Sequence, residues 1–248
     1  MKTLGALFAV ASLLVALAMF APASLLDARL QAATQGHLRL ADTAGTVWNG
    51  RGLVTSEAHT WSLPVSWRID PLSVVRGDIG IALQPAEGGD LPRGNVSWRD
   101  PTLTLDGVAF TLPAAALNGA IASGNAMVLG GYLAFDAPHL TLGSNGGDGA
   151  ASARWSGARL AGNAGMLALG TVTMNFAPRD GGIQGRVENR GGDARIEGEF
   201  ALGSAGIDFN ATLTPLPSTP PAVMRALGAL GTPEAGGAVR MQWRSGKL

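Results

Sequence analysis

The chain has 248 residues, with 18 basic and 18 acidic side chains and no cysteine. A formal charge of zero, with Lys and Arg scattered along the chain, gives no electrostatic basis for binding nucleic acid. The lack of cysteine excludes disulfides, thiolate nucleophiles and cysteine-bound metals. The 36 glycines exceed the usual share of about 7%, and a hydrophobic content of 46% is above that of disordered chains. This composition favours many short strands joined by frequent turns.

The N-terminus is strongly apolar. No charged residue stands between Lys2 and Asp27, and the run over 4–21 is apolar throughout. At about 1.5 Å per residue, a helix of this length spans roughly 27 Å, close to the ~30 Å thickness of a bilayer core. We therefore expect residues 1–21 to form a short cytoplasmic start and a transmembrane signal anchor, with the rest of the chain exported.

A second interpretation of this segment stays open. The "APA" at 21–23 fits the small-x-small cleavage rule of signal peptides, and cleavage after Ala23 would release the chain from the membrane. However, the apolar run is longer than the roughly 7–15 residues of a usual signal-peptide core. Pro22 also suits the first turn of a following helix. These features favour an uncleaved anchor, followed by a juxtamembrane helix or linker over 22–36.

From His37 onward the pattern changes to alternation. Apolar side chains recur at every second position in the runs at 37–42, 102–112, 172–176, 195–202, 206–215 and 238–243. A period of two predicts half-buried antiparallel strands. Clusters rich in Gly, Asn and Asp separate the later runs, at 144–149, 178–182, 189–193 and 203–206, and predict hairpin turns. We expect residues 37–248 to form a mainly β domain of about ten strands, a curved antiparallel sheet that is either an open groove or sandwich-like.

One segment near the C-terminus departs from alternation. Residues 218–231 place Val223, Leu227 and Leu230 at helical spacing. Ser218 or Thr219 would cap this helix, and the glycine at 231 would end it. We predict one short helix, either a lid on the sheet or a docking surface for a partner.

Motifs of catalysis and of metal binding are absent from the sequence. The histidines His37, His59 and His139 have no neighbours at zinc-ligand spacing, and no serine lies in a G-x-S-x-G elbow. No P-loop occurs, and no G-x-G-x-x-G opens a helix. The aspartates fall mostly at expected turns and strand ends, where turn formation accounts for them. We predict no catalytic residue, no cofactor, no metal site and no enzymatic activity.

The tryptophans carry more information. "WNG" at 48–50 is echoed by "WSG" at 155–157, and "VSWR" occurs at both 65–68 and 96–99. The unequal spacings exclude a regular repeat array. One interpretation is packing within the sheet with the indole N–H hydrogen-bonded. The other is an exposed hydrophobic surface that binds lipid or a partner, formed by Trp61, Trp67, Trp98 and Trp155.

After the expected anchor come Pro22, Leu25 and Leu26, and then a G-T-hydrophobic-W-x-G turn of Gly45, Thr46, Val47, Trp48 and Gly50. In the order of these features the chain resembles the general secretion pathway protein N family of the type II secretion system. The block at 63–83 and the C-terminal "VRMQWRSGKL" are also similar to the family. Residues 110–200 do not match it residue by residue.

The resemblance implies a single-pass inner-membrane protein whose β-rich domain lies in the periplasm. It would be an accessory component that supports export of folded proteins across the outer membrane through contacts with other secretion subunits. The family transfers no catalytic residue to this chain. A second resemblance, in architecture alone, is to AsmA-like envelope proteins, and it implies binding or conveying lipid in a hydrophobic β-groove. Fold alone does not decide between these functions.

Overall fold

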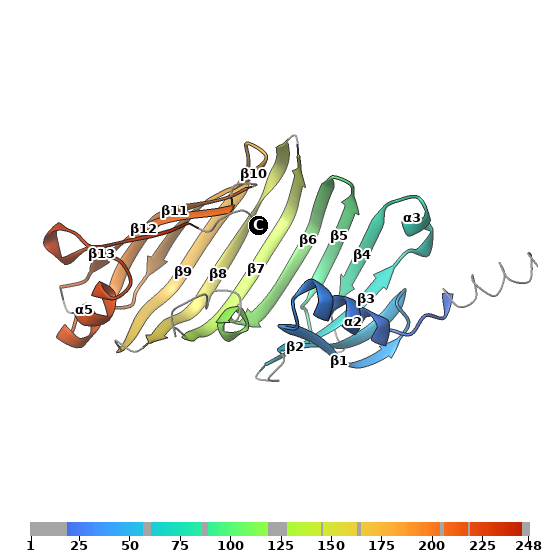
Figure 1. The fold of residues 1–248 in the computed structure, drawn as a ribbon, viewed down its shortest axis with the longest axis horizontal. Helices are drawn as coiled ribbons and strands as arrows, with labels where there is room; N and C mark the ends of the chain where they lie inside the picture. Colours follow the sequence, from blue (N-terminus) through green and yellow to red (C-terminus); the bar gives the residue numbers. More distant parts are fainter. Residues whose placement is uncertain are drawn as a thin grey trace, which may run out of the picture. The chain divides into compact units, whose positions relative to one another are not determined.

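A computed structural model of the chain describes residues 19–56, 61–85, 89–118, 128–144, 146–162, 165–203, 206–217 and 219–244. Its contacts divide the chain into two compact units, Met1–Asp100 and Pro101–Leu248, and we describe each by itself. In both, antiparallel strands follow one another in chain order (Figure 1), which confirms the expected mainly β class. The predicted anchor at 1–21 lies outside the described residues up to position 18. Within the described residues, no helix is long and apolar enough to cross a membrane.

In its described residues, the first unit is a five-stranded antiparallel sheet with two helices. Its elements are α2 (Ser24–Ala33), β1 (Leu38–Gly45), β2 (Asn49–Ser56), β3 (Ser62–Ile69), α3 (Pro71–Val75), β4 (Ile79–Gln84) and β5 (Arg93–Arg99). Each strand pairs with the next one along the chain. The helix α2 falls within the segment 22–36, where a juxtamembrane helix was expected.

The core of the first unit lies on one face of this sheet. Ala23, Leu40 and Trp67 are buried there, and Leu26 and Leu30 of α2 pack against them. Leu26 and Leu30 are four residues apart, so they lie on the same side of the helix. Burial of this apolar stripe is therefore what holds α2 against the sheet.

Side chains of α2 and of its C-cap residue also cap the free edge of β1. The Asp27 carboxylate accepts the backbone N–H of Leu40 (2.7 Å) and pairs with the Arg39 guanidinium (3.0 Å). The Thr34 hydroxyl accepts the N–H of Leu38 (3.1 Å). The Arg39 guanidinium and then the Leu40 N–H lower the pKa of Asp27. Because unpaired N–H groups at a sheet edge invite pairing with another chain, α2 protects this edge.

The part of the second unit that the structure describes is a nine-stranded antiparallel sheet. Its elements are β6 (Thr102–Pro113), η1 (Ala114–Leu117), β7 (Val128–Gly143), β8 (Gly146–Gly162), β9 (Gly165–Arg179), β10 (Gly182–Arg190), β11 (Ala194–Gly203), β12 (Gly206–Pro215), α5 (Pro221–Gly228), β13 (Thr232–Pro233), η2 (Ala235–Gly237) and β14 (Val239–Arg244). Strands β6 to β12 pair in chain order, β14 pairs with β12, and β13 pairs with β14. The predicted turn at 178–182 joins β9 to β10, with left-handed φ angles of 51° at Asp180 and 74° at Gly181.

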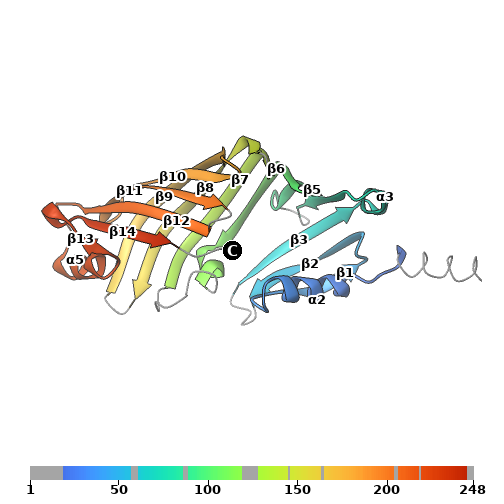
Figure 2. The ribbon, with the colours of Figure 1, turned by 45° about the horizontal axis from the view of Figure 1, so that its top comes forward.

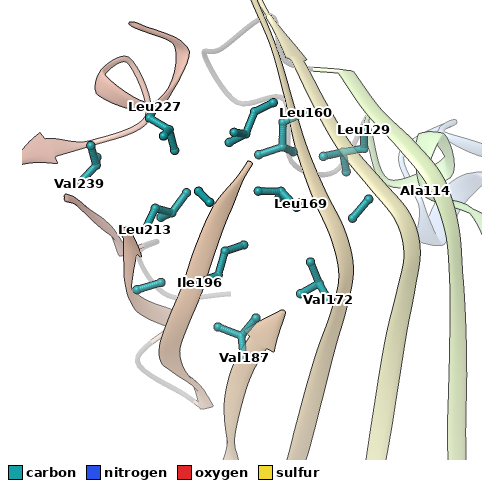
Figure 3. Packing of buried hydrophobic residues seen from close by; sticks show 14 residues of the cluster. Ala114, Leu129, Leu160, Leu169, Val172, Val187, Ile196, Leu213, Leu227 and Val239 are labelled. Atoms are coloured by element: carbon teal, nitrogen blue, oxygen red, sulfur yellow. The ribbon is translucent and has the colours of Figure 1, made fainter. Parts of the chain in front are cut away.

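A cluster of buried aliphatic side chains forms the core of this unit (Figure 3). Leu169, Ile196 and Leu213 come from β9, β11 and β12, and Leu227 comes from α5. The helix predicted within 218–231 is therefore present, and it covers one end of the sheet. The cap prediction for Thr219 was wrong, because the N-cap position is taken by Pro220 and the Thr219 hydroxyl donates to the carbonyl of Asp193 instead (2.6 Å).

Candidate functional site

The turn between β1 and β2 binds the start of the described chain. The N–H of Ala23 donates to the carbonyl of Gly45 (3.1 Å), and the N–H of Val47 donates to the carbonyl of Ala21 (2.9 Å). Between them, Pro22 and Thr46 form an antiparallel bridge. Residues 21–23 therefore run alongside this turn as a short added strand.

Two glycines of the turn are needed for this close packing. Gly45 has a φ of 90°, a left-handed conformation that side chains other than glycine's rarely adopt. Gly50 lies opposite Gly45 in the register of β1 and β2. A Cβ atom on Gly50 would lie 2.5 Å from Cζ2 of Trp67 and 2.8 Å from the carbonyl oxygen of Thr46. The G-T-hydrophobic-W-x-G pattern thus places glycine at the two positions of the turn where a neighbouring backbone atom or the Trp67 indole leaves no room for a side chain.

Trp67 and Trp48 fix the turn to β3. The Trp67 side chain is 5% exposed, and its indole N–H donates to the carbonyl of Val47 (2.9 Å). The carbonyl of Trp48 accepts the N–H of Ile69 (2.6 Å), and the Trp48 side chain is partly buried. The turn therefore joins three parts of the first unit: the entering chain at 21–23, the β1–β2 hairpin and the end of β3.

The remaining residues of the predicted motif divide between core and surface. Leu26 packs in the core of the first unit, whereas Leu25 is 53% exposed. The sequence pattern gives Trp67 no role in this turn, because its contact with Gly50 depends on the register of β2 against β3.

The four tryptophans predicted as a hydrophobic surface lie in different environments. Trp67 is buried, and Trp155 packs against the core of the second unit while its N–H donates to the carbonyl of Gly130 (2.8 Å). These two therefore have the packing role that was the alternative interpretation. Trp61 is partly buried, and Trp98 on β5 is 47% exposed. A partner surface at Trp61 and Trp98 stays a prediction.

A row of four phenylalanines crosses the apolar face of the second unit. Ring centroids are 5.0 Å apart for Phe110 and Phe135, 5.9 Å for Phe135 and Phe176, and 6.0 Å for Phe176 and Phe200. Phe176 and Phe200 lie on β9 and β11, with Gly185 of β10 directly between them. Strands that are two apart are separated by roughly 10 Å, so the rings converge over the glycine. The alternation in the sequence does not predict this row, because the row depends on strand register.

His139 makes a cross-strand contact on the opposite, polar face. Its Nδ1 lies 2.6 Å from Oδ1 of Asp106, and its Nε2 lies 3.3 Å from the hydroxyl of Thr141. Hydroxyl, imidazole and carboxylate in this order are the parts of a nucleophile relay. The His139 and Asp106 side chains are 50% and 53% exposed, so water surrounds the pair, and its clear role is to join β6 to β7. Among the described residues, no three His, Cys, Asp or Glu side chains gather closely enough to hold a metal ion.

The fold and the turn define a mainly β protein in which a Gly-Trp turn fastens the entering chain to an antiparallel sheet. The family model described as type II secretion system (T2SS), protein N, matches residues 36–242. The chain therefore belongs to this family, as its resemblance indicated, and takes part in type II secretion. The matched range includes Gly45, Thr46, Trp48 and Gly50, whereas Pro22 precedes it. No match was found among curated proteins or among solved structures.

Proposed function

We propose that the protein is an accessory inner-membrane component of the type II secretion system. Residues 1–21 form a single-pass signal anchor, and the β-rich remainder lies in the periplasm. There it supports export of folded proteins across the outer membrane through contacts with other secretion subunits. Membership of the protein N family supports the place in secretion.

The observation that most supports an uncleaved anchor is the backbone hydrogen bonding of residues 21–23 to the β1–β2 turn. Ala23 is 2% exposed, and both it and Ala21 hydrogen-bond to the turn through their backbones. Cleavage after Ala23 would remove these residues from the fold and leave the carbonyl of Gly45 and the N–H of Val47 without these partners. The fold thus favours keeping the segment that a signal peptidase would remove.

The intact mass of the protein purified from membranes tests the anchor. We expect the mass of the uncleaved chain and resistance to extraction by alkaline carbonate. The variant Ala21→Leu, which breaks the small-x-small pattern, gives the reference mass of an uncleavable chain. A native chain that begins at Ser24, while the variant stays full length, would overturn the anchor.

The edge of the second unit supports contacts with partner subunits. On the far side of β14, the short β13 pairs only with Val239 and Arg240 in the described part of the chain. Met241–Arg244 continues the strand, with Trp243 47% exposed. An open strand edge with an exposed aromatic suits addition of a strand from another protein.

Cross-linking in cells tests these contacts. A photoreactive amino acid at Trp243 is expected to capture another secretion subunit, identified by mass spectrometry. The same group at Thr214, an exposed position inside the sheet, is the matched control. Equal yields of the same products at both positions would contradict a specific contact at β14.

The phenylalanine row favours a second candidate function, lipid binding of the AsmA-like kind. Phe110, Phe135, Phe176 and Phe200 are all partly exposed and extend the apolar face beyond the buried cluster. Native mass spectrometry of the purified protein would detect a retained lipid. Phe176→Ser should lower the bound lipid, whereas Tyr132→Ser, at a 63% exposed position, should not. Absence of lipid from the unaltered protein would exclude this function.

A further inference from the structure

One end of the first unit gathers the entering chain and an exposed apolar helix. In the antiparallel register, Ile69 of β3 lies opposite Ile81, and Ile79 lies opposite Trp98 of β5. The β1–β2 turn is at the same end, because the carbonyl of Trp48 accepts the N–H of Ile69. The helix α3 follows β3 directly, so it also projects from this end (Figure 2).

The apolar side chains of α3 point away from the unit. Leu72 is 63% and Val75 is 85% exposed, and at a spacing of three residues they lie on one side of the helix. Ser73 is on the inner side, and its hydroxyl donates to the carbonyl of Asp70 (2.7 Å). Asp70 also caps α3 by accepting the N–H of Leu72 (3.0 Å). A surface helix normally buries its apolar side, so the reverse arrangement marks an interaction surface.

The chain enters the fold at this same end. The carbonyl of Ala21 is bonded to Val47 in the turn, and just before it Met19 is 49% and Phe20 is 79% exposed. The 18 residues that precede Met19 are almost entirely apolar. If they span the bilayer, as proposed above, α3 is held within reach of the membrane surface by the bonded turn.

We propose that this end of the first unit rests on the periplasmic surface of the inner membrane, with Leu72 and Val75 inserted at the boundary between headgroups and acyl chains. This inference depends on the proposed anchor. Trp98, which is 47% exposed at the same end, has the amphipathic ring favoured at that depth. Arg76 follows α3 and is exposed, in position to contact lipid phosphate. Two inserted side chains bind weakly by themselves, but tethering makes the contact intramolecular.

Labelling of the full chain in vesicles of phosphatidylethanolamine and phosphatidylglycerol tests the proposal. The chain has no cysteine, so Val75→Cys and Gln84→Cys each carry one environment-sensitive fluorophore. Both positions are exposed, and Gln84 pairs with Ser66 at the end of the β3–β4 pairing that is far from α3. We expect the Val75 label to emit further to the blue, to be quenched by spin-labelled lipid and to lose iodide quenching several-fold. The Gln84 label should stay fully open to iodide.

Three controls make each outcome decisive. Flotation of the vesicles and a label at Phe20→Cys report the anchor independently of α3. Flotation with a lipid-quenched Phe20 label but an aqueous Val75 label would overturn the inference and leave the anchor standing. Failure to float would remove the anchor, and the inference with it. A Val75 label shielded from iodide yet not quenched by spin-labelled lipid would indicate contact between copies of the chain and would also overturn the proposal.

Discussion

The indole of Trp67 packs over Gly50 and donates its N–H to the carbonyl of Val47 at 2.9 Å, so one side chain fastens β3 to the turn between β1 and β2. The same turn holds Ala21 and Ala23 through backbone hydrogen bonds. The link between the entering chain at 21–23 and the folded sheet thus depends on a contact that only glycine at position 50 allows.

Gly50→Ala is expected to destabilise the first unit. Its Cβ would lie 2.5 Å from the Trp67 ring, and overpacking of this kind costs about 1–3 kcal/mol. Gly80→Ala is the matched control, because there the nearest neighbour of an added Cβ among the described residues is the Ser73 hydroxyl at 3.9 Å. Urea unfolding of the detergent-solubilised full chain measures both. Equal midpoints for the two variants would show that the Trp67–Gly50 contact is not tight.

Trp67→Phe should also destabilise the unit, for a different reason. Phenylalanine keeps most of the ring but leaves the carbonyl of Val47 without its indole donor, at a cost of about 1–3 kcal/mol. Trp98→Phe removes an indole that is 47% exposed and should change the free energy of unfolding little. If both substitutions lower the free energy of unfolding by the same amount, the hydrogen bond from Trp67 to the Val47 carbonyl does not contribute to stability.

Asp27→Asn tests the cap on the edge of β1. The pKa of Asp27 is lowered by Arg39 and by the N–H of Leu40, so the folded state favours the charged form. The carboxylate therefore stabilises the fold above its unfolded pKa of about 3.9, and this contribution is lost as pH falls through the lower folded pKa. We expect the variant to be less stable at neutral pH and the difference to shrink in acid. Asp42→Asn, at an exposed position, is the control and should change the stability little at neutral pH. A stability difference for Asp27→Asn that stays constant from neutral to acid pH would contradict the charge-based account.

Asn189→Ala tests the joining of three strands in the second unit. The Asn189 amide donates to the carbonyls of Leu169 and Ala194 and accepts the N–H of Ile196, each at 2.8 Å. Each buried partner left unpaired costs about 1–3 kcal/mol, so the variant should unfold at clearly lower urea. Asn175→Ala, at an exposed position of β9, is the control. Similar losses at both positions would show that the Asn189 bonds do not govern stability.

The strands, the hairpin at 178–182 and the helix α5 could be predicted because each has a local signal in the sequence. Alternation identifies the strands because side chains on a strand point to opposite faces in turn. The glycine and aspartate at 180–181 identify a hairpin because they accept a left-handed backbone. Leu227 reveals α5 through its helical spacing, although Pro220 rather than a hydroxyl side chain takes the cap position.

The features that the sequence did not predict depend on contacts between segments that are far apart in the chain. The packing of Trp67 on Gly50 and the convergence of Phe176 and Phe200 over Gly185 both require knowledge of strand register. The capping of Leu40 by Asp27 joins a helix to a strand edge, and no spacing rule in the sequence encodes it. The sequence also did not predict the exposed apolar side of α3, because only the fold shows that Val75 is 85% exposed.

Secretion of a folded substrate tests the central claim most directly. The measurement compares the extracellular fraction of a type II substrate in cells that lack the gene, in cells complemented with the full chain, and in cells complemented with a chain whose residues 1–21 are replaced by a cleavable signal peptide. We predict that deletion retains the folded substrate in the periplasm, that the full chain restores secretion and that the untethered chain restores less. Secretion unchanged by the deletion would contradict a role for this protein in the type II secretion system.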